Sequence, residues 1–224
     1  MPSYFVTGTD TDVGKTYVSA ILLKAASEAG KKTVGYKPVS AGCEVINGRL
    51  VNEDASQLLA NSSLPVSQDE VNPIAFVPPI APHIAAQDAG VAISAETIKA
   101  GYMHLKAMSP DLLIMEGAGG WRLPLGDKRY LSDIVQQLKL DVIIVVGMRL
   151  GCLNHALLTA EAVQRDGLTI KGWIANQLHP DMPRYAENLD TLKAEMPAPF
   201  LGEIPYAKIP ANHELAALTQ QLCE

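Results

Sequence analysis

The chain has 224 residues, of which 48% are hydrophobic and 19% are charged, a composition typical of globular proteins. Its formal net charge of −6 gives no global basic surface for nucleic acid. No apolar run approaches the roughly 20 residues that cross a bilayer, and no secretory signal pattern opens the sequence. Three widely spaced cysteines without a CxxC pair argue against a disulfide framework or a zinc site. We therefore expect a cytoplasmic protein without membrane or nucleic-acid partners.

Apolar, β-rich segments alternate with helical patterns along the chain. In the first half of the chain, the pattern predicts a strand at residues 4–7, a helix at 16–29 that Gly30 ends, a strand at 33–38 and a short helix at 52–61. An irregular proline-rich segment at 72–90, a helix at 94–108 that Ser94 caps and a strand at 112–116 follow. The second half is predicted to have a strand at 141–147, a helix at 154–166 that Gly167 ends, a strand at 170–176, a helix near 184–195 and a strand at 200–205. A long loop such as 72–90 is more often functional or mobile than a simple connection.

The predicted strands are apolar on both faces, as in a parallel sheet that helices cover on both sides. Alternation of strands and helices gives βαβ units with right-handed crossovers. We therefore predict one doubly wound α/β domain over residues 1–224, with a mainly parallel sheet of about seven strands. Ligands of such sheets bind at the carboxyl ends of the strands, so residues that follow a strand are the candidates for a functional site.

The first such segment is GTDTDVGKT, residues 8–16, between a strand and a helix. A helix N-terminus offers unpaired N–H groups and a positive dipole end, which suit a phosphate. Gly14 lets the backbone approach a phosphate, Lys15 can reach terminal oxygens, and the Thr16 hydroxyl can ligate Mg²⁺. Five residues separate Gly8 from Gly14, where the strict phosphate-loop pattern has four. A glycine-rich turn that only opens a helix is the alternative, but the strand–helix context favours phosphate binding.

Three further charged residues lie near the ends of predicted elements. Glu116 follows the apolar run LLIM, and it is either a Mg²⁺ ligand near Thr16 or an ordinary strand-end acid. Lys37 ends the second strand, where packing explains a lysine poorly and a solvated lysine is the alternative. Asp54 stands at a helix start, where an acid is usually a cap. Lys15 and Lys37 together would stabilise a phosphoryl group in transfer, or would hold a second anion beside it.

The chain is similar to the dethiobiotin synthetases, ATP-dependent enzymes of the P-loop NTPase type. The segments that carry the resemblance are YFVTGTDTDVGKT, GYKPV, NEDA, VNPIAF, APHIAA, MEGAGGW, VVGMRLGCLNHALLTA, GWIANQ and APFLGEIPY. The resemblance implies that 7,8-diaminopelargonate and CO₂ are converted to dethiobiotin in biotin biosynthesis. One amine is carboxylated, the carbamate is phosphorylated by ATP to a carbamic-phosphoric anhydride, and the other amine closes the ring with release of ADP and phosphate.

The same resemblance implies a role for each matching residue. Lys37 and Lys15 would be catalytic. Thr16, Asp54 and Glu116 would hold Mg²⁺. ATP would contact Asp12, Val13, Gly14, Lys15, Thr16, Tyr17, Asp54, Glu116, Gly117, Ala118, Gly119, Asn176, Gln177, Pro205, Tyr206 and Ala207, with Asn176 reading the adenine edge and residues 205–207 bordering the base. The substrate would contact Thr11, Lys37, Ser40, Ala41, Gly151, Cys152 and Asn154.

Two parts of this assignment leave alternatives open. The resemblance implies a homodimer in which the turn in LGCLNHALLTA receives the carboxylate of the substrate tail across the interface. A helix N-terminus suits a carboxylate, although Asn154 can equally be a simple N-cap. Family members usually carry a hydroxyl where this chain has Ala41, and the nearest hydroxyl here is Ser40. The substrate contact at position 41 is therefore open.

Three other classes of protein share features of this sequence. An amide-forming ATPase of the cobyrinate-diamide type would ordinarily add a glutamine-hydrolysing domain, for which 224 residues leave no room. A switch ATPase of the MinD/ParA type would carry a second lysine in the phosphate loop, where this chain has Thr9 and Asp10. A dinucleotide-binding oxidoreductase would show G-x-G-x-x-G after the first strand, and this chain does not.

Overall fold

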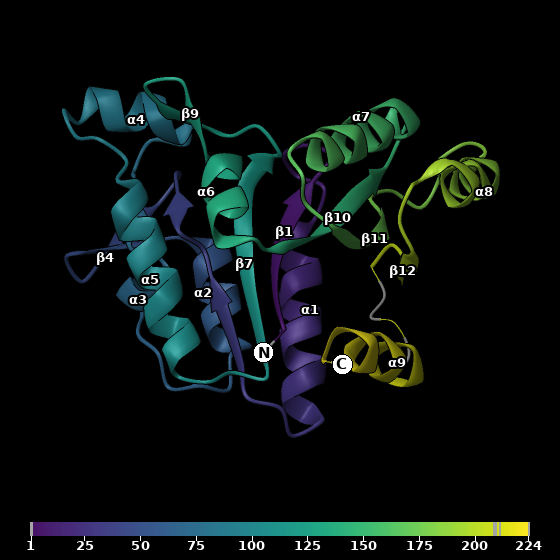
Figure 1. The fold of residues 1–224 in the computed structure, drawn as a ribbon, viewed down its shortest axis with the longest axis horizontal. Helices are drawn as coiled ribbons and strands as arrows, with labels where there is room; N and C mark the ends of the chain where they lie inside the picture. The colour runs from purple at the N-terminus through teal and green to yellow at the C-terminus, as the bar shows by residue number, and fades with distance from the viewer. Residues whose placement is uncertain (1, 208–209, 211, 224) are drawn as a thin grey trace.

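A computed structural model describes residues 2–207, 210 and 212–223. Its main sheet has six strands, which are β1 (Ser3–Gly8), β2 (Thr33–Tyr36), β7 (Leu112–Gly120), β10 (Asp141–Met148), β11 (Ile170–Gln177) and β12 (Phe200–Ile204). All neighbouring strands are parallel, in the order β12-β11-β10-β1-β7-β2 (Figure 1). The predicted doubly wound parallel sheet is confirmed, with six strands in place of about seven.

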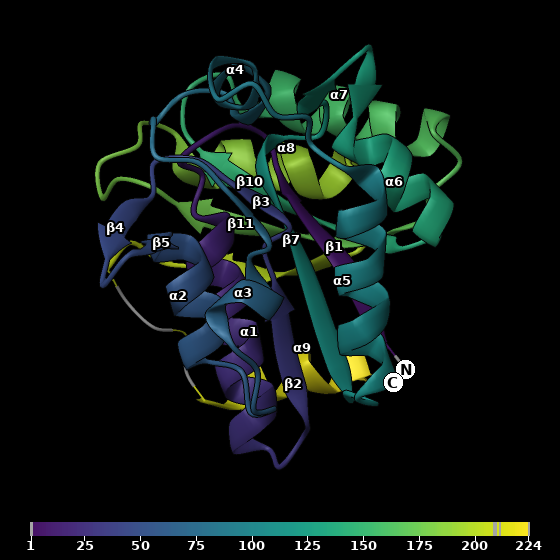
Figure 2. The ribbon, with the colours of Figure 1, turned by 90° about the vertical axis from the view of Figure 1, so that its left-hand side faces the viewer.

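Helices cover both faces of this sheet (Figures 1 and 2). One face packs against α1 (Lys15–Glu28), α2 (Glu53–Ala60), α3 (Gln68–Val71) and α9 (Asn212–Cys223). The other packs against α5 (Ala95–Ala107), α6 (Leu131–Leu138), α7 (Cys152–Arg165) and α8 (Tyr185–Glu195). Helix α4 (Pro82–Asp88) lies at the carboxyl edge of the sheet, at the top of Figure 1. The sheet separates two apolar cores, and this explains why its central strands are apolar on both sides.

Three pairs of short strands lie outside the main sheet. They are the parallel pair β3 (Val39–Ser40) and β6 (Ile74–Ala75), the antiparallel pair β4 (Glu44–Ile46) and β5 (Arg49–Val51), and the antiparallel pair β8 (Pro124–Gly126) and β9 (Arg129–Tyr130). The segment 72–90, predicted to be irregular, contains β6 and α4, so that prediction is wrong in part. Helices α3, α6 and α9 were not predicted, although α9 follows the strand predicted at residues 200–205.

Several predicted helix ends are confirmed by the backbone. Gly30 and Gly167 both have positive φ just after α1 and α7, the conformation in which glycine commonly ends a helix. Ser94 caps α5, since its hydroxyl accepts a hydrogen bond of 3.0 Å from the backbone N–H of Thr97. Among the described residues, no helix has the length and apolar character that crossing a membrane requires.

The predicted start of the helix after β10 is wrong. Helix α7 begins at Cys152, and its N-cap is Gly151 with φ 94°, so Asn154 lies inside the helix and does not cap it. A glycine in the left-handed region turns the chain directly from the end of β10 into the helix. The helix therefore starts two residues earlier than the polar side chain of Asn154 suggested.

Candidate active site

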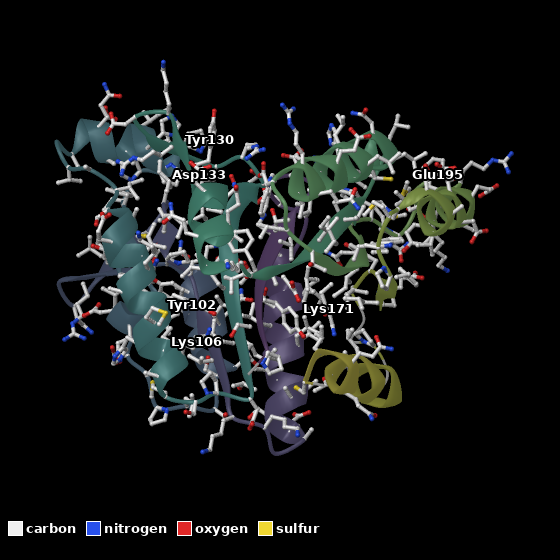
Figure 3. The ribbon with its side chains drawn as sticks, in the orientation of Figure 1. Tyr102, Lys106, Tyr130, Asp133, Lys171 and Glu195 are labelled. Carbon is white, nitrogen blue, oxygen red and sulfur yellow. The ribbon has the colours of Figure 1, made fainter. Side chains whose placement is uncertain are left out.

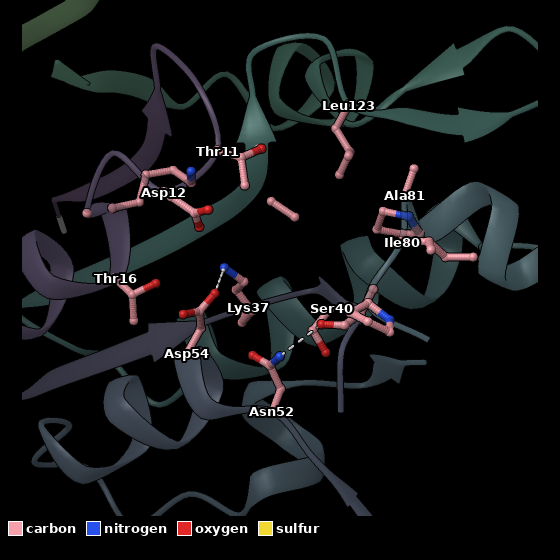
Figure 4. Close-up of a pocket in the computed structure, with 17 residues that line it drawn as sticks. Thr11, Asp12, Thr16, Lys37, Ser40, Asn52, Asp54, Ile80, Ala81 and Leu123 are labelled. Carbon is pink, nitrogen blue, oxygen red and sulfur yellow. Dashed lines mark hydrogen bonds and ion pairs between the residues drawn. The ribbon is translucent and has the colours of Figure 1, made fainter. Parts of the chain in front are cut away.

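A cleft of about 700 Å³ opens at the carboxyl ends of β1, β2 and β7 (Figure 4). Loops and helix starts that follow different strands meet there, as expected for a doubly wound sheet. The residues that line it are Thr11, Asp12, Gly14, Lys15, Thr16, Lys37, Ser40, Ala41, Asn52, Asp54, Pro79, Ile80, Ala81, Pro82, Ala118, Gly119 and Leu123. Most of them belong to the predicted phosphate, metal and substrate residues.

The loop between β1 and α1 is anchored against β11, which lies two strands from β1 in the sheet. The side-chain amide of Asn176 donates a hydrogen bond of 2.9 Å to the carbonyl oxygen of Val13, which is itself fully buried. Gly14 has φ 83°, and a Cβ built on it would lie 2.1 Å from Nδ2 of Asn176. Only glycine fits here, because both the left-handed backbone and the close amide exclude a side chain. The loop is therefore held in one shape before any ligand arrives.

Lys15 is buried at the first position of α1, with 6% of its surface exposed. Its ammonium donates to the backbone carbonyl of Asp10, at 3.0 Å. Burial and the nearby charge of Lys37 lower the pKa of Lys15 to about 8, although Glu116 and Asp54 act in the opposite direction. Lys15 thus has one neutral partner within its own loop and a proton that it can lose near physiological pH.

The carboxylate of Asp10 fixes the outer part of the same loop. Arg149, which follows β10, forms an ion pair with it, and the backbone N–H of Thr11 donates to it at 2.8 Å. These contacts tie the loop to the end of β10, beside the turn that opens α7. Sequence reasoning missed the Arg149–Asp10 pair, because 139 residues separate the two partners.

Lys37 is buried where the chain leaves β2, with 2% of its surface exposed. Its ammonium donates to Oε1 of Glu116 at 2.6 Å, to Oδ2 of Asp54 at 2.8 Å and to the carbonyl of Gly117 at 3.3 Å. Burial by itself lowers the pKa of Lys37, but the two carboxylates outweigh it and the pKa is raised overall. The interpretation of Lys37 as a solvated lysine is wrong, because it is a buried cation between two anions.

Glu116 is fully buried in β7, and its two carboxylate oxygens differ in their hydrogen bonds. Oε1 accepts from the hydroxyl of Thr16 at 2.7 Å and from Lys37 at 2.6 Å. Oε2 is buried and has no hydrogen-bond partner among the described residues. An unpaired buried carboxylate oxygen is costly, and a divalent cation is one partner that would satisfy it.

Asp54 lies in the first turn of α2 and faces the cleft. Asn52 caps this helix by accepting from the N–H of Ala55 at 3.2 Å, so the interpretation of Asp54 as a simple cap is wrong. Burial favours a raised pKa for Asp54, but the charge and hydrogen bond of Lys37 outweigh it, and the pKa is lowered. Two carboxylates and a hydroxyl, from Asp54, Glu116 and Thr16, are the donor set through which proteins commonly hold Mg²⁺ beside phosphates.

The far side of the cleft is built by Ser40 and Ala41. The Ser40 hydroxyl is buried and donates to the amide oxygen of Asn72 at 2.7 Å, and it lies 3.3 Å from the sulfur of Cys43. The carbonyl of Ala41 accepts from the Asn52 amide at 3.3 Å. The hydroxyl of Ser40, which precedes Ala41 in the chain, therefore already donates its hydrogen bond within the protein.

Another group of predicted residues gathers at the ends of β11 and β12, outside the lining of the cleft. The backbone N–H of Tyr206 donates to the side-chain oxygen of Gln177 at 3.2 Å. This bond places residues 205–207 beside the strand that carries Asn176 and Gln177. Tyr206 is 44% exposed, and the neighbouring Ala207 has φ 50°. Asn176 links this group to the phosphate-type loop through Val13.

The third group of predicted residues does not reach the cleft of the same chain. Gly151, Cys152 and Asn154 lie in the turn and first residues of α7, and none of them lines it. Leu150 in this turn is 98% exposed. Tyr17 is likewise not among the residues that line the cleft, and it is 39% exposed.

Sequence reasoning missed several residues that do line the cleft. Pro79, Ile80, Ala81 and Pro82 come from the long segment 72–90, whose length was the only signal. Asn52 was only the first residue of the predicted helix 52–61, and in the structure it caps α2 and contacts Ala41. Leu123 follows β7 and carried no signal that separates it from a core residue.

The fold and the loop between β1 and α1 define the class of protein. A parallel sheet whose first strand runs into a Gly-Lys-Thr loop and a helix is that of a P-loop nucleotide-binding protein. A family model described as an AAA domain matches residues 2–213. The structure is similar to the MinD cell division protein of Aquifex aeolicus, with a TM-score of 0.61 at 15% identity over 99% of this chain and 97% of that one. At that identity the likeness shows the fold alone.

Curated relatives define the family. An ATP-dependent dethiobiotin synthetase BioD of Alteromonas mediterranea is 57% identical over 98% of this chain and 99% of its own length. A protein of the same name from Pseudomonas aeruginosa is 51% identical over 92% of this chain and 90% of its own length. The chain belongs to the dethiobiotin synthetase family, as the sequence motifs predicted.

Proposed function

We propose that this chain catalyses the ATP-dependent conversion of 7,8-diaminopelargonate and CO₂ or bicarbonate to dethiobiotin. The observation that carries the proposal is the meeting of Lys15, Lys37 and Asp54 in one cleft beside a phosphate-type loop, with the buried Glu116 bound to Lys37. Family membership supplies the activity, because relatives of 48–57% identity bear the name ATP-dependent dethiobiotin synthetase. We further propose that residues 1–224 act as one synthetase domain in the cytoplasm.

ATP is proposed to bind along the loop and across the end of β11. The backbone of residues 12–17 would surround the phosphates, with the N-terminus of α1 directed at them. Asn176 and Gln177 would lie against the adenine, bordered by residues 205–207. Supporting this, a hydrogen bond joins Gln177 to Tyr206, and another joins Asn176 to the loop. Gly117, Ala118 and Gly119 would pass between nucleotide and substrate.

Mg²⁺ is the proposed metal, held by Thr16, Asp54 and Glu116. The buried free oxygen of Glu116 and the hard oxygen donors support this assignment. When bound, the ion would neutralise charge on the phosphates of ATP. The protein's own part is to keep Asp54 ionised, because Lys37 lowers the pKa of that carboxyl.

Lys37 and Lys15 are proposed to bring two anions together. A carbamate oxygen attacks the γ-phosphorus of ATP, and ADP leaves. The second amine then attacks the carbamoyl carbon, a C–N bond forms, and phosphate leaves. Both reacting groups are anionic in the first step, so cations that hold them side by side lower its barrier. Lys37 keeps its proton in this buried place because its pKa is raised.

The diamine is proposed to lie between the loop and the opposite wall of the cleft. Thr11, Lys37, Ser40 and Ala41 would contact its amine end in the same chain. A second copy would bring Gly151, Cys152 and Asn154 to the tail carboxylate, because these residues do not reach the cleft of their own chain. The proposal therefore includes a homodimer with the substrate between the two copies.

The release of phosphate from ATP tests the proposed activity. It is expected to require both 7,8-diaminopelargonate and bicarbonate, and to yield one dethiobiotin for each phosphate. Phosphate release that instead responds to glutamine, lipid vesicles or DNA would favour an amide-forming ATPase or a switch ATPase and would overturn the proposal. The likeness to MinD rests on the fold and gives no support to that alternative.

A further inference from the structure

A second hollow, of about 410 Å³, lies at the opposite edge of the sheet from the cleft, where β1 and β10 begin. We call it the amino-edge hollow, and it is defined by Ser3, Tyr102, Lys106, Lys139, Asp141 and Lys171. The labelled side chains of Tyr102 and Lys106 lie on α5, and Lys171 lies at the start of β11 (Figure 3). No residue proposed above for catalysis or nucleotide binding lines it.

The charge around this hollow is positive, although the protein as a whole has a net charge of −6. Lys106, Lys139 and Lys171 line it against one carboxylate, that of Asp141. Among residues 2–207, 210 and 212–223, none of these lysines has a carboxylate within ion-pairing distance. Lys106 belongs to α5, Lys171 to β11 and Lys139 to the turn after α6, and like charges that line one hollow repel one another unless an anion is present.

Two hydroxyl groups on the hollow lack partners, and one of them is deeply buried. Tyr102 is 1% exposed, and its hydroxyl has no hydrogen-bond partner among the described residues. The hydroxyl of Ser3 is buried and unpaired in the same way. Lys106 lies over the Tyr102 ring, 5.6 Å from its centre, so the tyrosine and the ammonium are held together. A buried phenol that donates to nothing is costly, and an anion beside it would remove that cost.

We propose that the amino-edge hollow binds a small anion that carries two or more negative charges, such as a phosphate or a dicarboxylate. The three lysines provide the charge, and the hydroxyls of Tyr102 and Ser3 provide hydrogen bonds that fix the orientation. The site lies across the full height of the sheet from the cleft, so it is separate from the nucleotide and substrate positions. Phosphate and carboxylate ligands share this chemistry, and the experiment separates them.

Residue-resolved acetylation of lysines tests the proposal on the whole protein. The rate at which each lysine reacts is measured by mass spectrometry with millimolar inorganic phosphate, with malonate, and with chloride at the same ionic strength. One of the two dianions is expected to protect Lys106, Lys139 and Lys171 severalfold, and the more protective one names the ligand class. Lys193 is the internal control. Its ammonium lies 4.7 Å from the centre of the Phe200 ring, a contact of the same kind as that of Lys106 with Tyr102, but Lys193 lies on α8 and does not line the hollow.

Tyr102→Phe removes one hydroxyl and is expected to raise the half-protecting anion concentration about tenfold, as the loss of a hydrogen bond to a charged group predicts. Lys171→Gln is the second variant, in case the first unfolds, and it is expected to weaken protection of the other two lysines. Dethiobiotin formation should be unchanged in both. Equal protection of Lys193, protection by chloride alone, no protection by either dianion, or unaltered protection in both variants would overturn the proposal.

Discussion

The two sides of the cleft hold their lysines in opposite ways. On the loop side, Lys15 donates to a neutral carbonyl, and its pKa is lowered to about 8 by burial. On the strand-end side, Lys37 donates to Glu116 and Asp54, and its pKa is raised. A buried ammonium keeps its proton only where carboxylates offset the loss of water. The charge of Lys37 is therefore balanced before ligands bind, whereas Lys15 hydrogen-bonds only a neutral group until an anion arrives.

Replacing Lys37 gives the largest expected effect and tests the strand-end side of the cleft directly. Lys37→Ala is expected to lower kcat by about 10²–10³, the range found when a group that stabilises developing charge is removed. ATP binding should be largely retained, because Lys37 follows β2 whereas the loop follows β1. Steady-state kinetics and ATP titration measure the two quantities.

The matched control for Lys37→Ala is Lys24→Ala, an exposed lysine on α1 that pairs with Glu28. A buried Glu116 left without its cation also destabilises the fold, by about 3–5 kcal/mol where one partner of a buried pair is removed. Thermal unfolding of the variant is therefore measured beside its activity. Turnover equal to that of the Lys24 variant, in a folded protein, would contradict the assigned role.

Glu116→Gln tests the difference between the two sides of the cleft in another way, because it removes one of the two carboxylates that bind Lys37. The Mg²⁺ concentration for half-maximal activity is expected to rise about tenfold, the lower end of the effect of losing one contact to a metal site. Glu28→Gln on the surface of α1 is the control. A Mg²⁺ titration that matches the unaltered protein would argue that the free oxygen of Glu116 serves another purpose.

The pH dependence tests the loop side. Lys15 has a pKa lowered to about 8, so it is charged below that pH and neutral above it. Its attraction for ATP is therefore present at low pH, and kcat/KM for ATP is expected to fall as pH rises through about 8. Lys15→Arg, which stays charged, should shift this fall to higher pH. A flat profile across that pH, or the same profile in the arginine variant, would show that Lys15 is not the titrating group.

Asn176→Ala has the smallest expected effect, because it loosens the anchor of the loop without touching a charge. The buried carbonyl of Val13 loses its donor, which costs about 1–3 kcal/mol of folding free energy. ATP affinity is expected to fall severalfold while kcat changes less, since Lys37 stays in place. Chemical denaturation and ATP titration measure these changes. Asn188→Ala, which removes an exposed amide on α8, is the control.

The parts of this protein that sequence reasoning predicted well are local. Gly14, Lys15 and Thr16 are neighbours in the chain, so their joint presence at the start of a helix follows from the pattern alone. The alternation of apolar strands and helices was enough for the doubly wound sheet. The start of α7 was wrong, because the left-handed glycine at 151 outweighed the polar side chain at 154.

The parts that sequence reasoning left open depend on contacts between distant segments. Lys37 is 17 residues from Asp54 and 79 from Glu116, and no spacing rule says that their side chains touch. The free oxygen of Glu116, the Arg149–Asp10 pair and the committed hydroxyl of Ser40 are likewise seen only after folding.

Chain order and residue type thus specify which chemistry this protein carries, because a phosphate loop and a strand-end acid are recognisable in short segments. The state of each group is set by the folded surroundings. Burial and neighbouring charge leave one lysine close to losing its proton and the other firmly charged. Water is removed and partners are supplied only when distant strands come together, and these two factors govern the pKa of a buried side chain.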